Sequence, residues 1–428
     1  MRRPRVILVV MADDAYTRRA DDAQAVIELA RELGGTIDLT TLLERITATA
    51  LRVLECDRAT VFLYDAARDE LYSRVATGVE GLRFNARAGI AGQAVQTRRA
   101  IIVPDAYADP RFNREIDEKT GYRTRNLLTL PLVGHDGKIV GVLQVLNKLR
   151  GDFTTADEAL ADVLGKLAGV AVQRQILLDE YHTKCRLEQD LELARQIQQR
   201  LLPRENPRIP GFDIAGWNRP ADQTGGDCFD FLPMAGDRLG FLVADATGHG
   251  IGPALIIAQC RAMLRSIASI YDDLSGIATH VNRLLCQDIP EDRFVTACFG
   301  VLEPAANRLS YVSAGHGPIL HYHAAAGVAE ELPPTGMPMG IINDHEFDAA
   351  DPRTLDPGDI LAVLTDGFVE WARPDDEQFG TQRVVQVFRD HPTMPAGKLI
   401  DVLYREVIRF GEGTEQRDDL TAVIIKRL

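Results

Sequence analysis

The stretch Leu239-Gly-Phe-Leu-Val-Ala-Asp-Ala-Thr-Gly-His-Gly250 joins an apolar run to an aspartate and a glycine-rich turn. The run 239–244 has the composition of a buried strand. Asp245 follows it directly, and a carboxylate at such a position must be paired or bind a metal, because burying an unpaired charge is costly. The glycines beyond it let the backbone approach a ligand closely. The stretch therefore predicts a site at the end of a buried strand.

Three more aspartates in the second half of the chain lie beside a turn or a strand end. Asp227 ends the Gly-Gly-Asp of residues 225–227, Asp366 follows the apolar run 361–365, and Asp418 precedes the run 420–425. Any one of them alone is more simply read as a turn residue. Together they are expected to converge, and clustered carboxylates repel unless a cation shares them. An oxygen-only set favours Mg²⁺ or Mn²⁺, and two such ions can activate a water and clamp a phosphoryl group.

Residues 190–428 resemble the SpoIIE-type branch of the PPM metal-dependent protein phosphatases. The matching stretches follow the family order: Leu193-Ala-Arg-Gln-Ile-Gln198, Leu201-Leu-Pro203, Pro220-Ala-Asp-Gln-Thr-Gly-Gly-Asp-Cys-Phe-Asp230, Asp245-Ala-Thr-Gly-His-Gly250, Phe294-Val-Thr296, Ala314-Gly-His316, Thr365-Asp-Gly-Phe-Val-Glu370, Phe379-Gly380 and Asp418-Asp-Leu-Thr421. The resemblance implies an α-β-β-α sandwich. It also implies hydrolysis of phosphoserine or phosphothreonine by a metal-activated water.

The same resemblance implies a role for each aspartate. Asp227 and Asp245 are expected to hold the first metal, with Asp245 bridging to the second and the Ala246 carbonyl also contributing. Asp366 and Asp418 are expected to complete the shell of the other ion. These four aspartates are the expected catalytic residues, and the cofactor is two ions of Mn²⁺ or Mg²⁺.

Neighbouring residues have less direct expected roles. Asp419 is not expected to be a direct ligand. His249 and His316 are acid–base candidates by residue type, but neither is a standard ligand in the family and neither is expected to be essential to the chemistry. His249 lies where the glycine-rich turn enters a helix, so a positioning role is expected for it. Cys228 could be a reactive thiol only if its pKa were low.

The first half of the chain indicates an α+β domain. Its pattern is helical over 21–54 with a break at Gly34-Gly35, where Asp38 or Thr40 could cap the second helix. Strand patterns follow at 59–64, 71–76, 127–133 and 138–146. A helix begins at Thr155. We therefore expect helices, an antiparallel sheet, and a helix.

Residues 24–180 resemble a GAF domain. Asn147-Lys148, Phe153 and Asp157-Glu158 match the NK…F…DE signature of cyclic-nucleotide phosphodiesterase GAF domains. The resemblance implies a sensor that could take a small-molecule ligand. A second reading is that Asn147 and Lys148 form a structural lock. No ligand-binding residue is assigned within this domain.

A long helix connects the halves. Neither proline nor glycine interrupts the chain between Val170 and Leu202. One reading is a two-chain coiled coil, and hence a homodimer; the other is a helix packed on its own domain. Apolar residues lie roughly on one stripe, with Gln198 in the seam: Leu177, Tyr181, Leu187, Leu191, Ala194 and Leu201.

The expected division is an N-terminal segment (1–23), a GAF sensor domain (24–173), a helical linker (174–203) and a phosphatase domain (204–428). The chain has 428 residues and a net charge of −14, which argues against nucleic-acid binding. The run 6–11 is too short to span a bilayer, and no other stretch approaches that length, so no membrane association is expected. Six cysteines without a CxxC pair favour the cytoplasm.

The leading functional hypothesis is a regulated phosphatase. In the family, the substrates are phosphorylated anti-anti-sigma proteins of the STAS class, so sigma-factor regulation is expected. The helix 174–202 would transmit the GAF signal by repacking on 253–271, which would set whether Asp245 and the Ala246 carbonyl hold metal. The alternatives are a catalytically silent scaffold and a protein that sequesters a nucleotide.

Overall fold

The computed structural model describes Gln24, Ile27, Glu28, Arg31 and residues 38–76 and 81–428. The segment 1–23 and most of the helix expected before residue 38 lie outside the described residues. The described chain forms two compact units, the first ending at Cys185 and the second running from Arg186 to Leu428. Each unit is taken by itself below.

The first unit is built on a six-stranded antiparallel sheet in the order β3-β2-β1-β6-β5-β4. Its strands are β1 (Cys56–Asp65), β2 (Glu70–Ala76), β3 (Arg83–Asn85), β4 (Ile101–Val103), β5 (Leu127–Val133) and β6 (Ile139–Lys148). Its helices are α2 (Leu39–Val53), α3 (Gly89–Thr97), α4 (Arg114–Thr120) and the first part of α5 (Thr155–Leu201). The predicted α+β class is confirmed.

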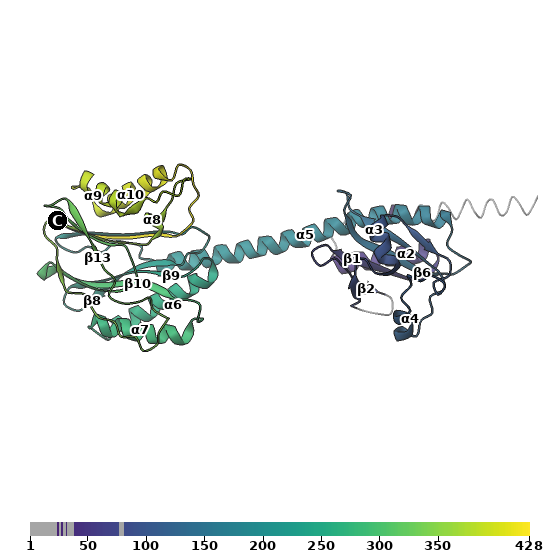
Figure 1. The fold of residues 1–428 in the computed structure, drawn as a ribbon, viewed down its shortest axis with the longest axis horizontal. Helices are drawn as coiled ribbons and strands as arrows, with labels where there is room; N and C mark the ends of the chain where they lie inside the picture. The colour runs from purple at the N-terminus through teal and green to yellow at the C-terminus, as the bar shows by residue number, and fades with distance from the viewer. Residues whose placement is uncertain (1–23, 25–26, 29–30, 32–37, 77–80) are drawn as a thin grey trace, which may run out of the picture. The chain divides into compact units, whose positions relative to one another are not determined.

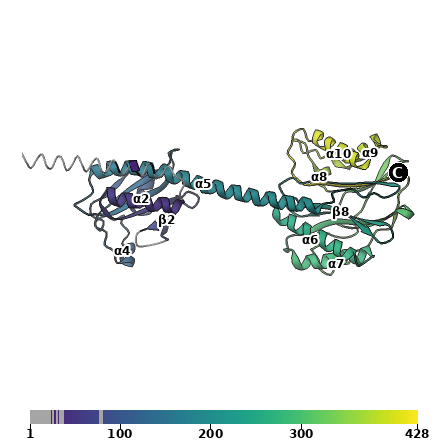
Figure 2. The same ribbon diagram turned by 180° about the vertical axis from the view of Figure 1, so that it is seen from behind.

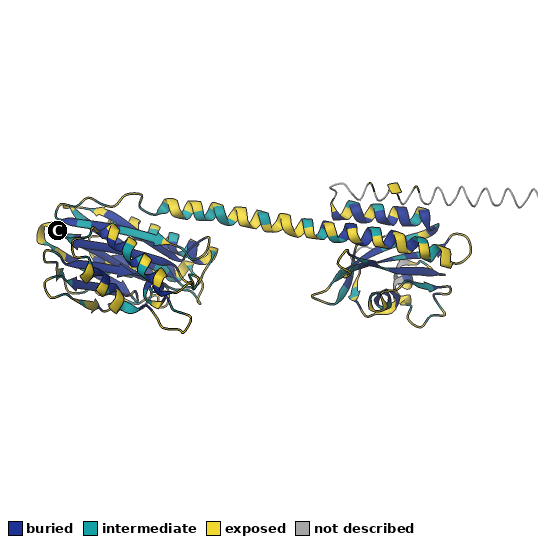
Figure 3. Ribbon diagram, turned by 90° about the horizontal axis from the view of Figure 1, so that it is seen from above, coloured by how far each residue is buried: buried dark blue, intermediate teal, exposed yellow. Residues whose placement is uncertain are grey.

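Both faces of this sheet are covered. On one face α2 and α5 pack side by side, burying Leu43 and Ile46 of α2 against Ala168 and Val172 of α5 and the central strands (Figure 3). α3 covers the other face through Ala91. The predicted cap of α2 is confirmed at Asp38, whose carboxylate accepts a hydrogen bond from the Thr41 N–H.

The second unit contains two five-stranded sheets, ordered β14-β11-β10-β9-β8 and β13-β12-β15-β16-β7. Its strands are β7 (Phe212–Arg219), β8 (Asp227–Met234), β9 (Arg238–Ala246), β10 (Val295–Glu303), β11 (Arg308–Ala314), β12 (Ile319–His323), β13 (Val328–Leu332), β14 (Arg353–Thr354), β15 (Ile360–Leu364) and β16 (Leu420–Arg427). Its helices are α6 (Ile251–Ala268), α7 (Leu274–Asp288), α8 (Gly367–Glu370), α9 (Gly380–Asp390) and α10 (Ala396–Phe410), with a 3-10 turn η1 (Pro304–Ala306).

The two sheets face each other and helices cover both outer sides, which confirms the predicted α-β-β-α sandwich (Figures 1 and 2). The core between the sheets contains Phe229, Phe241 and Val363. α6 and α7 pack on the first sheet, and α8, α9 and α10 pack on the second. The layers form because strands that are apolar on both faces, such as β9 and β15, must be covered on both sides.

α6 is long and apolar enough to cross a membrane by length and composition, with a mean hydropathy of 1.2. The expectation that no stretch approaches this length was therefore wrong for α6. About a third of the helix is buried, and Ile257, Cys260 and Leu264 face the core beneath the first sheet. The core helix of a soluble protein can meet the same criterion.

Sequence patterns missed several elements that polar residues interrupt. β8 was read only as a Gly-Gly-Asp turn, yet it continues to Met234 with Asp227 and Asp230 both buried. β12 was missed because its pattern, Ile-Leu-His-Tyr-His, carries two histidines. Asp245 lies inside β9 rather than just beyond it. These strands form because cross-strand partners bury them, which a local pattern does not reveal.

Candidate functional site

Asp227 and Asp245 are direct cross-strand partners on β8 and β9. On its other side Asp245 is opposite Thr296 of β10. Gly226 lies so close to this pair that an added Cβ would be 2.6 Å from the Ala246 carbonyl oxygen and 3.3 Å from Asp245 Oδ1. A larger residue at 226 would fill the space in front of these oxygens, so the Gly-Gly-Asp sequence keeps them accessible.

Asp366 and Asp418 reach the same end of the sandwich from the second sheet. Asp366 follows β15 and begins α8, and Asp418 lies two residues before β16, the strand paired with β15. The charges of both act on Asp245. The structure therefore brings all four predicted aspartates into one electrostatic cluster at the edge where the two sheets meet.

Asp227 is almost completely buried, and two hydroxyl groups hold its carboxylate. Its Oδ2 accepts hydrogen bonds from Thr365 Oγ1 at 2.8 Å and from Thr421 Oγ1 at 2.7 Å. Asn218 Nδ2 in turn donates to Thr421 Oγ1 at 2.8 Å. This network fixes the rotamer of Asp227, because a buried carboxylate with several donors has one low-energy orientation.

Asp419 organises the loop before β8. Its Oδ1 accepts from the Ala221 N–H at 2.7 Å, and its Oδ2 accepts from the Asp227 N–H at 3.3 Å. An added Cβ on Gly225 would collide with the Asp419 carboxylate. Asp419 thus ties the strand end at 420 to the loop that carries Asp227.

Without a bound cation, the negative charges of these carboxylates repel one another and are unfavourable to bury. Burial, and then the charges of Asp245 and Asp419, raise the pKa of Asp227 well above its usual range. Burial, followed by the charges of Asp366 and Asp418, raises the pKa of Asp245 to about 7. Burial and then the Asp418 charge raise the pKa of Asp366 to about 6. A divalent cation would remove this repulsion.

The donor chemistry fits Mg²⁺ or Mn²⁺. The aspartates and the Ala246 carbonyl offer only oxygen atoms, which these hard cations prefer. The carboxylates come from strands of both sheets. Such ions normally keep several waters.

The two candidate histidines differ in environment. His316 is buried, with Nδ1 3.1 Å from Thr296 Oγ1, and burial lowers its pKa to about 4, so it is neutral. Thr296 is opposite Asp245, so His316 supports the strand that carries the site. His249 is exposed, with Nδ1 3.5 Å from Asp222 Oδ2. Burial raises the pKa of the Cys228 thiol well above its usual range, which argues against a reactive thiol.

Sequence reasoning missed a contact between the last turn of α5 and the loop that precedes Asp227. Gln198, on the last turn of α5, donates from Nε2 to the Gly225 carbonyl at 2.5 Å and accepts from the Gly225 N–H at 3.1 Å on Oε1. Gly225 is two residues from Asp227. The available signal is Gln198 itself, a polar residue within the apolar stripe of the helix.

In the first unit, the signature residue Lys148 forms an internal brace. Its Nζ lies 2.6 Å from Asp157 Oδ1, donates to the Leu54 carbonyl at 3.0 Å, and is 5.8 Å from the centre of the Phe153 ring. Burial acts to raise the pKa of Asp157, but hydrogen bonds from Lys148 and Thr154 outweigh it and the pKa is lowered.

Asn147 adds a second brace at a left-handed backbone position with φ 56°. Its Oδ1 accepts from the Arg125 N–H, and its Nδ2 donates to the Tyr122 hydroxyl and the Arg123 carbonyl. The geometry favours the structural-lock reading of both signature residues. Cys56 is buried, and burial raises its pKa to about 12.

Comparison with family models assigns both units. Residues 38–172 match the GAF domain model, and residues 235–428 match the model of Stage II sporulation protein E (SpoIIE). The chain joins a GAF domain to a SpoIIE-type phosphatase domain. The SpoIIE match includes Asp245, Asp366 and Asp418, while Asp227 lies eight residues before its start.

Two curated proteins are each similar to a little over half of the chain. Protein IcfG of Synechocystis sp. is 26% identical over 265 residues, covering 56% of this chain and 41% of IcfG. Phosphoserine phosphatase RsbU of Bacillus subtilis is 23% identical over 241 residues, covering 56% of this chain and 71% of RsbU. The chain thus spans less than half the length of IcfG. Among solved structures, the SiaA-PP2C domain of Pseudomonas aeruginosa aligns with a TM-score of 0.49 and 22% identity, covering 57% of this chain and 98% of that domain.

Proposed function

We propose that the SpoIIE-type domain hydrolyses phosphoserine or phosphothreonine on a partner protein. The observation that carries this proposal is the aspartate cluster contributed by both sheets, which offers only oxygen ligands: Asp227 is buried, Asp245 and Asp366 are half-buried, and all three have raised pKa values. The likeness to RsbU, which is named a phosphoserine phosphatase, supports the reaction class.

Each residue has a proposed part in holding the cations. Asp227 and Asp245, with the Ala246 carbonyl, would hold one ion, and Asp366 and Asp418 the other, with Asp245 shared. Two bound divalent cations would lower the pKa of a water and neutralise charge on the phosphoryl oxygens. The absence of Cys and His from this set is why we propose Mn²⁺ or Mg²⁺ rather than zinc.

Hydrogen bonds within the protein fix the position of Asp227 and of the loop that precedes it. The hydroxyls of Thr365 and Thr421 hold Asp227 in one orientation. Asp419 holds the loop that leads to Asp227 through two backbone N–H groups. Fixed ligands reduce the reorganisation that cation binding and phosphoryl transfer would otherwise require.

For the substrate we propose a phosphorylated STAS-class protein in the cytoplasm. This rests on the resemblance to sigma-factor regulators and on the likeness to RsbU. The six cysteines are free, as expected for a reducing compartment.

We also propose that α5 carries the GAF signal to the site. The Gln198–Gly225 pair links the last turn of the helix to the loop before Asp227. Leu202, just beyond the helix, packs against the cluster that contains Ile257 of α6. A shift or rotation of α5 would therefore disturb the Asp227 loop directly and the α6 packing through Leu202. Only the second route corresponds to the two-state mechanism expected from the sequence.

The stripe on α5 supports the proposal of a homodimer. Leu177, Tyr181 and Leu187 are 51%, 62% and 57% exposed, so the reading in which they pack on their own domain is disfavoured. A second copy of the same helix offers the matching stripe. We expect light scattering to show a dimer that Leu187→Glu weakens, with Ile270→Glu, at a 77% exposed position outside α5, as the control; a monomeric parent chain would refute the proposal.

The decisive experiment measures Mn²⁺-dependent phosphatase activity of the full chain on p-nitrophenyl phosphate and on a phosphoserine STAS protein. Asp245→Asn and Asp366→Asn are expected to abolish both activities. Asp237→Asn is the matched control, because this exposed turn residue has φ 58° and Asn tolerates that conformation.

The two substrates separate the two parts of the proposal. Activity on p-nitrophenyl phosphate alone would refute the STAS substrate and keep the phosphatase. Absence of both activities, also when residues 1–180 are removed, would favour a silent scaffold.

A further inference from the structure

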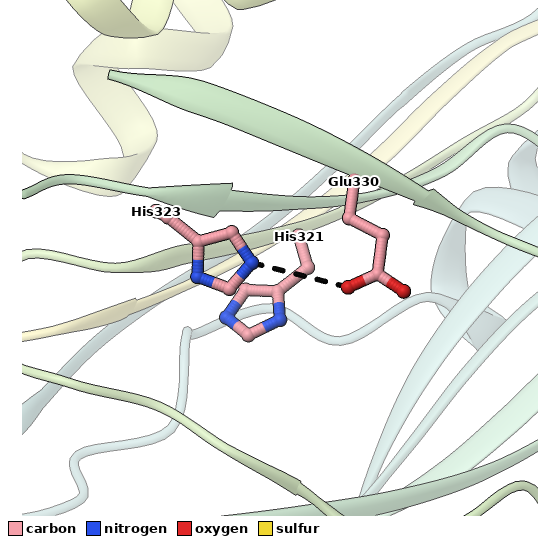
Figure 4. Close-up of side chains that lie close together, drawn as sticks. All are labelled: His321, His323 and Glu330. Carbon is pink, nitrogen blue, oxygen red and sulfur yellow. Dashed lines mark ion pairs between the residues drawn. The ribbon is translucent and has the colours of Figure 1, made fainter. Parts of the chain in front are cut away.

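A second group of potential metal ligands lies in the phosphatase domain, away from the aspartate cluster. Among the described residues, His321, His323 and Glu330 offer ligand atoms that all lie within 4.8 Å of one another. His321 and Glu330 are direct cross-strand partners on β12 and β13, and His323 is two residues further along β12. All three therefore project from one face of the sheet, as Figure 4 shows.

His321 is the unusual member of the group. It is only 2% exposed, and neither Nδ1 nor Nε2 has a hydrogen-bond partner. A neutral imidazole always carries one N–H donor and one acceptor, and leaving them unpaired in the protein interior is unfavourable. Burial, and then the His323 charge, lower the pKa of His321, which favours the neutral form that binds metals.

Asp359 lies near one nitrogen of each of the two histidines. Asp359 Oδ2 lies 3.4 Å from His321 Nε2 and 3.7 Å from His323 Nδ1. The Asp359 carboxylate is already engaged, because it accepts hydrogen bonds from the backbone N–H groups of Ala324 and Asp356. Asp359 thus lies beside one nitrogen of each imidazole and leaves His321 Nδ1 and His323 Nε2 as the candidate ligand atoms, in the arrangement by which a carboxylate orients a metal-binding histidine.

The two carboxylate oxygens of Glu330 face different partners. Oε1 lies 3.3 Å from Arg353 Nη2, whereas Oε2 faces His323 Nε2 at 3.9 Å (Figure 4). The Arg353 cation holds one oxygen and leaves the other pointing toward the histidines.

We propose that His321, His323 and Glu330 form a binding site for a transition-metal ion of the zinc class. Two imidazoles and a carboxylate suit Zn²⁺ or Co²⁺, whereas Mg²⁺ and Mn²⁺ prefer oxygen ligands. Ligand atoms around a tetrahedral zinc ion lie roughly 3.3 Å apart, so the group must contract. The side chains of His323 and Glu330 are 39% and 44% exposed and can rotate inward, while the buried His321 stays fixed.

The site would have a structural effect. β13 is an edge strand of its sheet and pairs only with β12 in the sheet order. An ion held by His321 and His323 of β12 and by Glu330 of β13 would cross-link that edge. Because metal binding to the folded state adds to stability, Zn²⁺ should raise the unfolding temperature of the domain.

The test uses the full chain, stripped of metal by a chelator and then kept in excess Mg²⁺ to fill the aspartate cluster. Titration with Co²⁺ should give the visible absorption bands of a nitrogen-bound ion, saturating at one ion per chain, and Zn²⁺ should displace it. His323→Gln and Glu330→Gln should each weaken Co²⁺ binding by at least about 100-fold, since even losing an outer partner costs roughly 10- to 100-fold.

His280→Gln is the control, because His280 is an exposed histidine of α7 in the same unit; it should bind Co²⁺ like the parent. Circular dichroism checks that the variants at the two partly exposed positions are folded. The proposal is overturned if the parent binds no Co²⁺ in excess Mg²⁺, or if folded His323→Gln and Glu330→Gln bind it as the parent does. None of these readouts depends on phosphatase activity.

Discussion

Gln198→Leu tests the proposed link between α5 and the loop that precedes Asp227. The substitution removes both hydrogen bonds to Gly225, while leucine preserves helix propensity and approximate size. Without them, the loop that leads to Asp227 loses its attachment to α5. We expect the variant to fold and to need more Mn²⁺ for activity.

The magnitude follows from the two contacts. A neutral hydrogen bond contributes about 0.5–1.5 kcal/mol net, so the pair is worth about 1–3 kcal/mol. If that energy favours the metal-binding form of the loop, its loss raises the Mn²⁺ concentration for half-maximal activity by roughly 5- to 150-fold, at tenfold per 1.4 kcal/mol. The activity at saturating Mn²⁺ should change much less, because Gln198 does not contact the predicted ligands.

The assay is hydrolysis of p-nitrophenyl phosphate across a Mn²⁺ titration. Gln199→Leu is the matched control, because Gln199 is an exposed neighbour on the same turn of α5. Equal Mn²⁺ requirements in the Gln198 and Gln199 variants would refute the link. A loss of activity in Gln198→Leu that no Mn²⁺ concentration restores would also refute it, since it would place Gln198 in the chemistry rather than in loop positioning.

Three further predictions test the supporting structure. Thr421→Val removes one of the two hydrogen bonds that hydroxyl groups donate to Asp227, which is worth about 1.5–3 kcal/mol for a charged acceptor. Isothermal calorimetry should show Mn²⁺ binding weakened by roughly tenfold or more, and unchanged binding would contradict the role of this network. The pKa of His316 is lowered from 6.5 to about 4 in the folded state, so protonation favours the unfolded chain, and the free energy of unfolding falls by about 3 kcal/mol as the pH drops from 6.5 toward 4. Urea unfolding of His316→Gln should lack this pH dependence, and identical pH profiles for the variant and the parent would exclude it. Lys148→Met leaves Asp157 without its ion-pair partner and should destabilise the GAF domain by about 3 kcal/mol in calorimetry, whereas a change below about 0.5 kcal/mol would show that the brace is dispensable.

Local patterns predicted much of the fold correctly. The long helix was expected from Thr155 to Leu202 and ends at Leu201, because no proline or glycine interrupts the chain from Val170 until Pro203. The strand before Asp366 was also correct, since its continuous apolar run suits a strand buried on both faces. β8 and β12 were not found, because polar side chains within them are satisfied or buried only by distant partners.

The sequence by itself determined that four aspartates lie beside strands or turns and that their oxygen-only chemistry suits hard cations. Only the tertiary structure decided how they are supported: Asp227 is held by Thr365 and Thr421, which follow it by 138 and 194 residues. It also placed Gln198 against Gly225 and aligned His321 with Glu330 across a strand pair. The physical reason is that periodicity reports which face of an element is buried, whereas strand register and layer packing decide which residues meet there.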